Sequence, residues 1–283
     1  MDEQIPKKLL IVNDMTGFGR CSIAVALPII STCKVQAIPV PTSVFSNHTG
    51  FPTYYKKDMT VYMQDYLKQL DTVAGEFDGI YCGYFGSLMQ MHIMEEYIRK
   101  HIRSSSKKPI IIIDPVMGDH GNAYHSITPD FCQQMQQFIQ NSDLLTPNIT
   151  EACLLTNTPY HDGSWTETEL TLITDKLSSM GPSQIVITGI CDHQFFHNYI
   201  RQADGSHTII KTPVSGSSRP GTGDIFASIV AALIMRCYDL PAAVEIASSF
   251  IAKCTQASDE AGIPTQEGVL FELFLNELTN LSS

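Results

Sequence analysis

The chain has 283 residues, 43% of them hydrophobic, which suits one large domain or two small ones with an ample core. Its 18 Lys and Arg residues are outweighed by 29 Asp and Glu residues, and a net charge of −11 argues against nucleic-acid binding, which needs a basic surface. No apolar stretch is long enough to span a membrane, and the first residues lack the apolar core of a signal peptide, so we expect a cytoplasmic protein with no membrane partner.

Short apolar runs alternate with amphipathic segments along the chain. The expected strands cover residues 8–13, 35–40, 77–82, 109–114, 143–146 and 184–188. The expected helices cover residues 22–30, 58–72, 88–103, 129–140, 167–180, 224–236, 241–257 and 267–280, and a further helix opens at 147–151. The alternating segments 194–201 and 207–211 predict a hairpin. A glycine-containing turn is expected at 14–20 and a polar loop at 42–50.

Strands that alternate with helices predict a three-layer α/β/α sandwich, in which a central, mostly parallel sheet lies between helices. The run PIIIID at 109–114 is the clearest strand, because a fully apolar run is typical of a parallel strand buried on both faces. Ligands of such sheets bind at the carboxyl ends of the strands. We therefore expect seven turns on one rim, those at Asn13, Thr42, Gly83, Asp114, Thr146, Thr188 and Gly221.

The stretch SRPGTGD at 218–224 is followed by an apolar run of helical length. Gly221 and Gly223 lack a Cβ, so the backbone can approach a ligand closely. The unpaired N–H groups and the positive end of the dipole at a helix start make an anion site. Because a fixed negative charge would repel phosphate, we interpret Asp224 as a base that takes a proton from a hydroxyl. The alternative, that Thr222 or Asp224 is an N-cap, stays open.

Two further groups of polar side chains follow expected strands. Asp114 and Asp119 come just past a buried strand, where they could hold Mg²⁺ against phosphates. The alternative is turn chemistry, since Asp before Pro commonly starts a turn. Asn148 and Glu151 begin a helix, where an ordinary helix start competes with an ordering role in the water shell of the metal.

Five motifs occur in one order along residues 8–260: FSNHTG at 45–50, GY at 83–84, DPVMGD at 114–119, TPN at 146–148 with Glu151, and GTGD at 221–224. In this combination they resemble the pyridoxal kinases, the vitamin B6 branch of the ribokinase superfamily. The GTGD turn marks the superfamily, whereas the FSNHT stretch is much more specific to the B6 branch.

The resemblance implies one ribokinase-like kinase domain over residues 1–283, with a flap at 117–126. It implies transfer of the ATP γ-phosphoryl group to the 5′-hydroxyl of pyridoxal, pyridoxamine or pyridoxine, by a homodimer that uses Mg²⁺ and allows a monovalent cation such as K⁺. Asp224 is then the catalytic base, and the amides of Gly221, Thr222 and Gly223 form the anion hole.

The resemblance also implies the remaining site residues. The positions expected at the B6 vitamer are Asn13, Thr42, His48, Tyr84 and Asp224. The positions expected at ATP are Asp114, Asp119, Asn148, Glu151, Thr188, Gly221 and Gly223. The positions expected at the metal are Asp114, Asp119 and Glu151.

The chain departs from the family pattern near its start. Animal and enteric pyridoxal kinases carry a Ser-His pair that meets the pyridine, and Asn13-Asp14 holds its place here. The start at 14–20 is closer to firmicute members and is slightly similar to hydroxymethylpyrimidine kinases of thiamine synthesis, which are the alternative function. A non-catalytic carrier of pyridoxal phosphate is a third hypothesis, which the presence of Asp224 disfavours.

Overall fold

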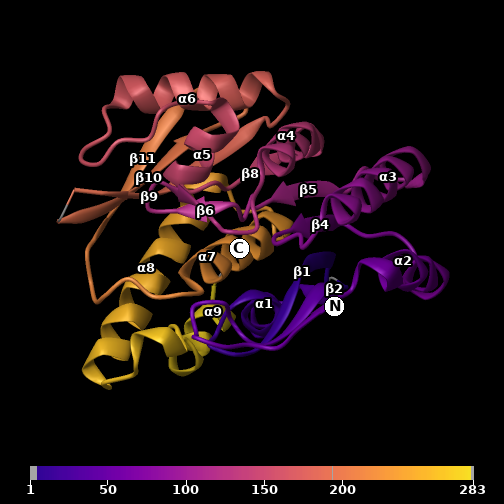
Figure 1. Ribbon diagram of the computed structural model, residues 1–283, viewed down its shortest axis with the longest axis horizontal. Helices are drawn as coiled ribbons and strands as arrows, with labels where there is room; N and C mark the ends of the chain where they lie inside the picture. Colours follow the sequence, from indigo (N-terminus) through magenta and orange to yellow (C-terminus); the bar gives the residue numbers. More distant parts are fainter. Residues whose placement is uncertain (1–4, 193, 282–283) are drawn as a thin grey trace.

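In the computed structural model, which describes residues 5–192 and 194–281, nine strands form one sheet in the order β11-β10-β9-β8-β5-β4-β1-β2-β3 (Figure 1). The pairs from β2 to β9 are parallel, whereas β3, β10 and β11 pair antiparallel at the edges. The strands are β1 (Lys8–Phe18), β2 (Gln36–Asn47), β3 (Lys56–Asp58), β4 (Gly79–Cys82), β5 (Ile110–Ile113), β8 (Leu144–Leu145), β9 (Gln184–Cys191), β10 (Phe195–Arg201) and β11 (His207–Pro213). The expected hairpin at β10 and β11 is confirmed.

Helices cover both faces of the sheet (Figure 1). One core lies under α2 (Thr60–Ala74), α3 (Leu88–Ser104), α4 (Pro129–Phe138), α5 (Ile149–Thr156) and α6 (Glu167–Ser179). The other lies under α1 (Ser22–Thr32), α7 (Thr222–Met235), α8 (Leu240–Glu260) and α9 (Leu275–Thr279). Ile111 and Ile113 enter the first core and Ile112 the second, which explains the unbroken apolar run. The predicted α/β/α sandwich is confirmed.

Within the described residues, no helix has the length and apolarity needed to cross a membrane.

The sheet has a switch point beside β1. β2 pairs with one edge of β1 and β4 with the other, and the helices α1 and α2 that flank β2 in the sequence pack on opposite faces. In open α/β sheets, ligands bind in the crevice outside the carboxyl ends of strands at such a point. The topology therefore directs attention to the residues that follow β4 and to the outer part of β1.

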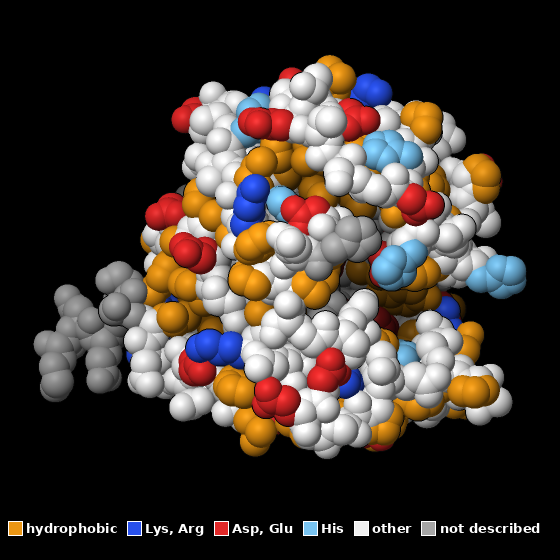
Figure 2. All heavy atoms as spheres, turned by 90° about the vertical axis from the view of Figure 1, so that its left-hand side faces the viewer, with side chains coloured by type: hydrophobic (Ala, Val, Ile, Leu, Met, Phe, Trp, Pro, Cys, Tyr) orange, Lys and Arg blue, Asp and Glu red, His pale blue; other side chains and the backbone are white. Residues whose placement is uncertain are grey.

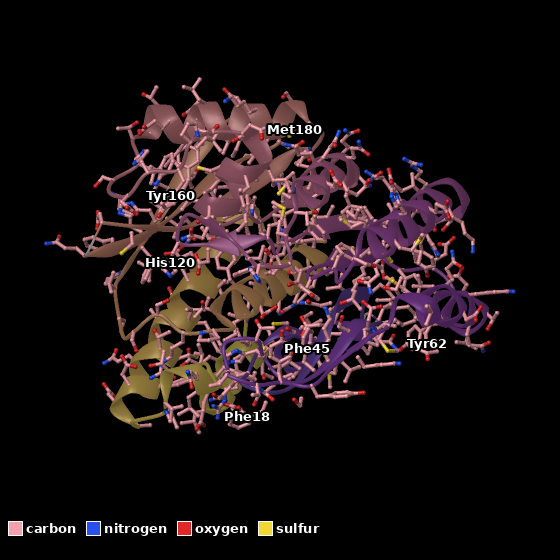
Figure 3. The ribbon with its side chains drawn as sticks, viewed as in Figure 1. Phe18, Phe45, Tyr62, His120, Tyr160 and Met180 are labelled. Atoms are coloured by element: carbon pink, nitrogen blue, oxygen red, sulfur yellow. The ribbon has the colours of Figure 1, made fainter. Side chains whose placement is uncertain are left out.

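The turn expected at 14–20 and the loop expected at 42–50 were wrong for most of their length. β1 continues to Phe18 and β2 to Asn47, and the two remain paired after a register shift beyond Asn13. Along this extension polar residues such as Thr42 and Ser43 are buried whereas Val44 is exposed, and this reversal of the usual pattern obscured the strand. Phe18 and Phe45 mark the extension in Figure 3.

Two other expectations at the ends of the fold also failed. The short edge strand β3 was missed because its sequence, Lys-Lys-Asp, carries no apolar alternation. The helix expected at 267–280 is reduced to α9, preceded by the 3₁₀ turns Thr265–Glu267 and Glu272–Phe274. Between these turns, Val269 and Phe271 are buried in the core, and a continuous helix would not place both there.

Arg219 ties this irregular segment to the glycine turn at 221–224. Its buried guanidinium donates to the Asp259 carboxylate at 2.6 Å. It also donates to the backbone oxygens of Ile263, Pro264 and Gly268 at 2.9, 3.3 and 3.2 Å. The turn that begins α7 is therefore anchored to the chain beyond α8 through a residue two positions before Gly221.

We expect Arg219→Met to lower the free energy of unfolding by about 2–4 kcal/mol, since it removes the donor to the backbone oxygens of Ile263 and Gly268 and to the Asp259 carboxylate. Lys253→Met is the matched control, because it breaks the exposed ion pair to Glu277 (2.7 Å) and is expected to cost less than about 1 kcal/mol. Urea unfolding of both variants measures the difference. Equal losses would contradict the anchoring role.

Candidate active site

Four of the residues expected at the substrate are joined by hydrogen bonds at the switch point. The Asn13 side-chain oxygen accepts the Tyr84 backbone N–H at 2.9 Å, and its Nδ2 donates to Asp224 Oδ1 at 3.2 Å. The Thr42 hydroxyl donates to the Tyr84 carbonyl oxygen at 2.9 Å. Strands β1 and β2, the loop after β4 and helix α7 thus meet at one place.

The N-terminus of α7 borders this cluster and is open for a ligand. Gly221 holds the N-cap position, and within the described chain no side chain caps it. The Thr222 hydroxyl donates instead to the Arg219 carbonyl oxygen at 3.2 Å, and Asp224 lies inside the first turn. The N-cap alternative for Thr222 and Asp224 is therefore wrong, and the first amides of α7 keep their N–H groups free for an anion.

The two glycines of this turn have different reasons to be glycine. Gly221 has φ of +84°, and a Cβ there would lie 2.0 Å from the Arg20 carbonyl oxygen. A Cβ on Gly223 would meet no atom within 4 Å. Packing therefore dictates Gly221, whereas Gly223 borders open space at the helix N-terminus.

Asp224 has the electrostatics of a base that works near neutral pH. Burial raises its pKa to about 6, and the nearby Asp14 charge also raises it. Hydrogen bonds from the Ser22 backbone N–H and the Asn13 amide favour the ionised form and limit the rise. A carboxyl group with this pKa is mostly ionised at pH 7 and still accepts a proton readily.

Asp114 and Glu151 place two more carboxyl groups beside Asp224. Burial raises the pKa of Asp114 well above its ordinary value, and the charges of Glu151 and Asp224 raise it further. Burial also raises the pKa of Glu151 to about 8, against hydrogen bonds from the backbone N–H groups of Met117 and Asn148. Among the described residues, none donates a hydrogen bond to the Asp114 carboxylate. This concentration of negative charge fits a bound cation.

Asn148 and Glu151 form an ordinary helix start, which was one of the two interpretations of these residues in the sequence. The Asn148 side-chain oxygen accepts the Glu151 N–H at 2.9 Å, and the Glu151 carboxylate accepts the Asn148 N–H at 2.8 Å. This capping box also secures the loop after β5, because Asn148 Nδ2 donates to the Gly118 carbonyl oxygen at 2.7 Å. A parallel bridge between Asn148 and Thr188 places Thr188 on the same rim.

Asp119 lies apart from the two buried acids, in the hairpin β6 (Gly118–Asp119) and β7 (Asn122–Ala123). Its exposed carboxylate accepts the His120 backbone N–H at 2.8 Å. The hairpin rests on α5, where the Gly121 N–H donates to the Thr150 hydroxyl at 2.9 Å, and His120 lies at the same edge of the molecule as Tyr160 (Figure 3). In residues 5–192 and 194–281, no three His, Cys, Asp or Glu side chains converge as a metal site. Phosphates and water would have to complete the shell of a Mg²⁺ ion.

His48 has partners other than the four joined residues. Its Nδ1 accepts the Gly50 N–H at 3.0 Å, so the proton lies on Nε2, which donates to the Gln266 carbonyl oxygen at 2.7 Å. Its ring also packs on Phe51, with centroids 4.7 Å apart. His48 thus connects the end of β2 to the C-terminal segment and does not contact Asn13, Thr42 or Tyr84 by hydrogen bond.

Lys56 is a site residue that the motif analysis missed. It lies on β3, donates to the Tyr84 hydroxyl at 3.1 Å, and stands 5.4 Å from the centre of the Phe45 ring. It is the cation that faces the wall formed by Phe45 and Tyr84. No local signal marks it, since it becomes part of the site only when β3 pairs with β2.

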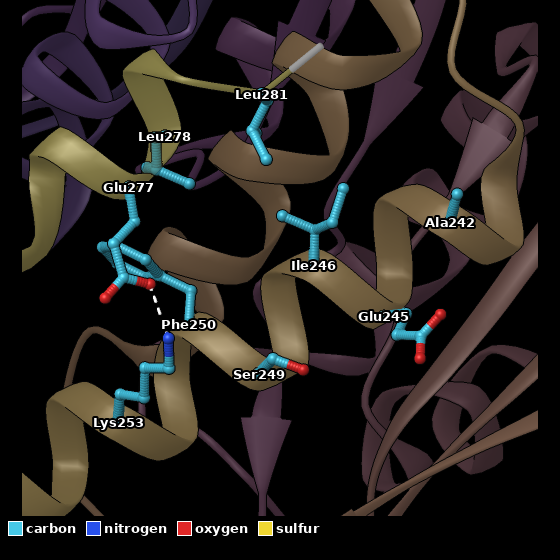
Figure 4. Close-up of a pocket in the computed structure, with 9 residues that line it drawn as sticks. All are labelled: Ala242, Glu245, Ile246, Ser249, Phe250, Lys253, Glu277, Leu278 and Leu281. Atoms are coloured by element: carbon cyan, nitrogen blue, oxygen red, sulfur yellow. Dashed lines mark hydrogen bonds and ion pairs between the residues drawn. The ribbon is translucent and has the colours of Figure 1, made fainter. Parts of the chain in front are cut away.

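Neither the face in Figure 2 nor a groove beside α8 has the character of a phosphate site. On the face in Figure 2, Lys and Arg side chains are scattered rather than gathered in a patch. A groove of about 430 Å³ lies between α8 and the C-terminal segment, but it shares no residue with the cluster (Figure 4). Its lining is mainly apolar, including Ile246, Phe250 and Leu278, and one of its acids, Glu277, is paired with Lys253 at 2.7 Å.

The family model and the curated relatives that match this chain are described as kinases of small molecules. The family model described as phosphomethylpyrimidine kinase matches residues 26–268. A curated relative, the pyridoxine/pyridoxal/pyridoxamine kinase of Bordetella avium, is 24% identical over 261 residues, which cover 88% of this chain and 86% of the relative.

Solved structures agree with this. A Bacteroides thetaiotaomicron protein described as a candidate phosphomethylpyrimidine kinase, crystallised with pyridoxal, is 32% identical with a TM-score of 0.90 over 96% of both chains. The pyridoxal kinase of Leishmania donovani in complex with ADP and pyridoxamine is 19% identical, and it matches in fold, with a TM-score of 0.84 over 98% of this chain and 97% of its own.

We expect the two glycines to separate stability from ligand binding. Gly221→Ala forces a Cβ into the Arg20 carbonyl oxygen and a residue with φ of +84°, so it should lower the free energy of unfolding by at least about 2 kcal/mol. Gly223→Ala should unfold at nearly the wild-type urea concentration but bind ADP at least about tenfold more weakly, because the new methyl group intrudes on the anion site. Titration calorimetry with ADP and urea unfolding test the pair, and the reverse pattern would refute this assignment.

Proposed function

The chain belongs to the phosphomethylpyrimidine kinase family, and we propose that within it this protein is a pyridoxal kinase. It transfers the γ-phosphoryl group of ATP to the 5′-hydroxymethyl group of pyridoxal, pyridoxamine or pyridoxine. The observation that carries the proposal is the link from Asn13 to both Tyr84 and Asp224 beside the open N-terminus of α7. Through this link Asn13 connects Tyr84, which would contact the substrate ring, with the base Asp224 and the anion site at the start of α7. The names of the relatives support the same activity.

In the proposed reaction, Asp224 accepts the proton of the substrate's hydroxymethyl group while the oxygen of that hydroxymethyl group attacks the γ-phosphorus. The new O–P bond forms as the bond between the γ-phosphorus and the β,γ-bridging oxygen breaks, and ADP leaves. The amides of Thr222 and Gly223, at the turn begun by Gly221, stabilise the charge on the transferred group. Asn13 holds the carboxylate of Asp224 in place throughout.

Asp114 and Glu151, with Asp119 from the flap, would hold Mg²⁺ and the nucleotide phosphates, with Asn148 and Thr188 on the same rim. The metal would neutralise phosphate charge during the transfer. The raised pKa values of Asp114 and Glu151 support this role, because a nearby cation favours the ionised form of both. A monovalent cation such as K⁺ would bind at the same acidic rim and reduce the repulsion among its carboxylates.

The substrate ring would lie against Tyr84, with Thr42 and Asn13 beside it and Lys56 at its edge. Residues 117–126 would act as the flap that excludes water, which limits idle ATP hydrolysis. The family resemblance further supports one kinase domain over 1–283, a homodimer and a cytoplasmic location. His48 would act by holding the C-terminal segment against β2 rather than by contact with the ring.

The second candidate function is phosphorylation of hydroxymethylpyrimidine, which the name of the matching family model favours. Steady-state assays with ATP and Mg²⁺ separate the two when the three B6 vitamers and hydroxymethylpyrimidine are compared. We expect a B6 vitamer to lead by at least about tenfold in kcat/KM, or about 1.4 kcal/mol of transition-state binding. A lead by the pyrimidine would overturn the proposal in favour of this alternative.

Asp224→Ala should lower turnover by about 10²–10⁴-fold, the usual contribution of a positioned base. Its binding of ADP, measured by calorimetry, should change little, because the free amides of α7 remain. An undiminished kcat would remove Asp224 from the mechanism.

The pH profile of the wild type gives an independent test. Since Asp224 must be ionised to accept a proton and its pKa is raised to about 6, kcat/KM should be full above that pH and fall as pH drops through it. The limb should fall by about one decade per pH unit, as for loss of one proton acceptor. A limb near the ordinary aspartate pKa would show that Asp224 does not control it.

A further inference from the structure

Asp14 is a buried acid that the proposed mechanism does not use. Only 7% of its surface is exposed. Its Oδ1 accepts the Ser22 hydroxyl at 2.7 Å and its Oδ2 accepts the Thr16 hydroxyl at 2.6 Å. Both oxygens are therefore engaged inside the protein, which fits a structural role better than contact with a substrate.

Ser22 has an uncommon backbone conformation for a residue with a side chain. Its φ is +58°, in the left-handed region, which costs a non-glycine residue about 1 kcal/mol or more. Such a conformation persists only where its surroundings hold it. Here the hydroxyl is held by Asp14, and the backbone N–H of Ser22 acts on the Asp224 carboxylate by favouring its ionised form, which lowers its pKa.

The same short segment also contacts the glycine turn. Arg20 has φ of +51°, and its carbonyl oxygen lies so close to Gly221 that no Cβ fits there. Its guanidinium is fixed by Glu272 at 2.7 Å and by the Glu267 carbonyl oxygen at 3.1 Å. Residues 20–22 therefore form a wedge that touches both Asp224 and the turn that begins α7.

The shape of β1 explains how two successive residues serve one carboxylate. Successive side chains of a strand point to opposite faces, yet Asn13 donates to the Asp224 carboxylate and the charge of Asp14 raises the pKa of the same group. The register of β1 and β2 shifts between Asn13 and Met15, and such irregularities re-aim side chains. Asn13 contacts Asp224 directly, and Asp14 reaches it through Ser22.

We propose that Asp14 is a positioning residue of this kinase: by holding the Ser22 hydroxyl it fixes the wedge at 20–22, which in turn orients the Asp224 carboxylate and the anion-binding turn. The inference rests on the proposed function of the site. It gives the Asn13-Asp14 pair a joint role, in which both residues act on Asp224 from the irregular point of β1.

The charge of Asp14 has a second, measurable effect. It raises the pKa of Asp224. Among the described residues, Asp14 also interacts with Lys56 on β3, the Cys21 thiol and the Tyr81 hydroxyl on β4, and burial raises the pKa of both the thiol and the hydroxyl. Removal of the Asp14 charge should therefore lower the pKa of Asp224 and move the acid limb of the pH profile to lower pH.

Three variants test the proposal in assays of kcat, KM and pH dependence. Asp14→Asn removes the charge. Ser22→Gly removes the hydroxyl tether but keeps the backbone N–H and tolerates the positive φ. Thr16→Val is the matched control, because it removes the other hydroxyl bonded to Asp14, on the side that does not contact Asp224.

Asp14→Asn and Ser22→Gly should each lower kcat by about 10- to 100-fold, the scale of a misplaced catalytic group, with KM for ATP and vitamer within about threefold. Thr16→Val should keep kcat within about threefold of the wild type. The double variant that combines Asp14→Asn with Ser22→Gly should lose no more kcat than the single variant with the larger loss, since both changes act through one tether. Only Asp14→Asn should move the acid limb to lower pH, which a purely structural role would not do.

The proposal is overturned if Thr16→Val loses as much kcat as Ser22→Gly, or if the losses of Asp14→Asn and Ser22→Gly multiply in the double variant. It is also overturned if Asp14→Asn keeps both kcat and the acid limb of the wild type. Should Asp14→Asn fail to fold by circular dichroism, Ser22→Gly against Thr16→Val decides alone. A wild type that phosphorylates no hydroxymethyl substrate refutes the kinase function itself, which separates that failure from failure of the Asp14 inference.

Discussion

The side-chain amide of Asn13 is the contact on which the arrangement of the site depends. It accepts from the loop after β4 and donates to a carboxylate 211 positions further along the chain. Because an amide offers a donor and an acceptor in one plane, it can join two elements that have no other reason to meet at a fixed angle. The parallel strands bring their carboxyl ends to one rim, and Asn13 turns that proximity into a defined geometry.

The second constraint is electrostatic. The rim collects Asp114, Glu151 and Asp224 in a protein whose net charge is already −11. All three carboxyl groups have raised pKa values, so their ionised forms are disfavoured in the free protein. The folded state carries this cost at the site, and the two apolar cores on either side of the sheet offset it. The same cost makes the rim receptive to cations, which relieve the repulsion.

The sequence allowed the sheet, most helices and a shared rim for Asn13, Thr42, Gly83 and Gly221 to be predicted, because buried parallel strands leave continuous apolar runs and their ends share a rim. The grouping of Tyr84 and Asp224 with Asn13 and Thr42 at one substrate was implied by the family resemblance. The sequence did not reveal the extension of β1 and β2, because several of the residues buried there, such as Thr16 and Thr42, are polar.

Tertiary contacts decide the rest. Lys56 joins the site only through strand pairing. The contact between the Asp14 carboxylate and the Ser22 hydroxyl depends on a left-handed backbone conformation at Ser22, which cannot be predicted from the residue type.

The buried bonds of Arg219 to residues 259–268 also bear on biosynthesis. A ribosome delivers those acceptors 40 to 49 residues after Arg219, so the glycine turn stays unanchored until then. The anion-binding turn of a nascent chain therefore gains its anchor only after α8 and the segment beyond it have been made.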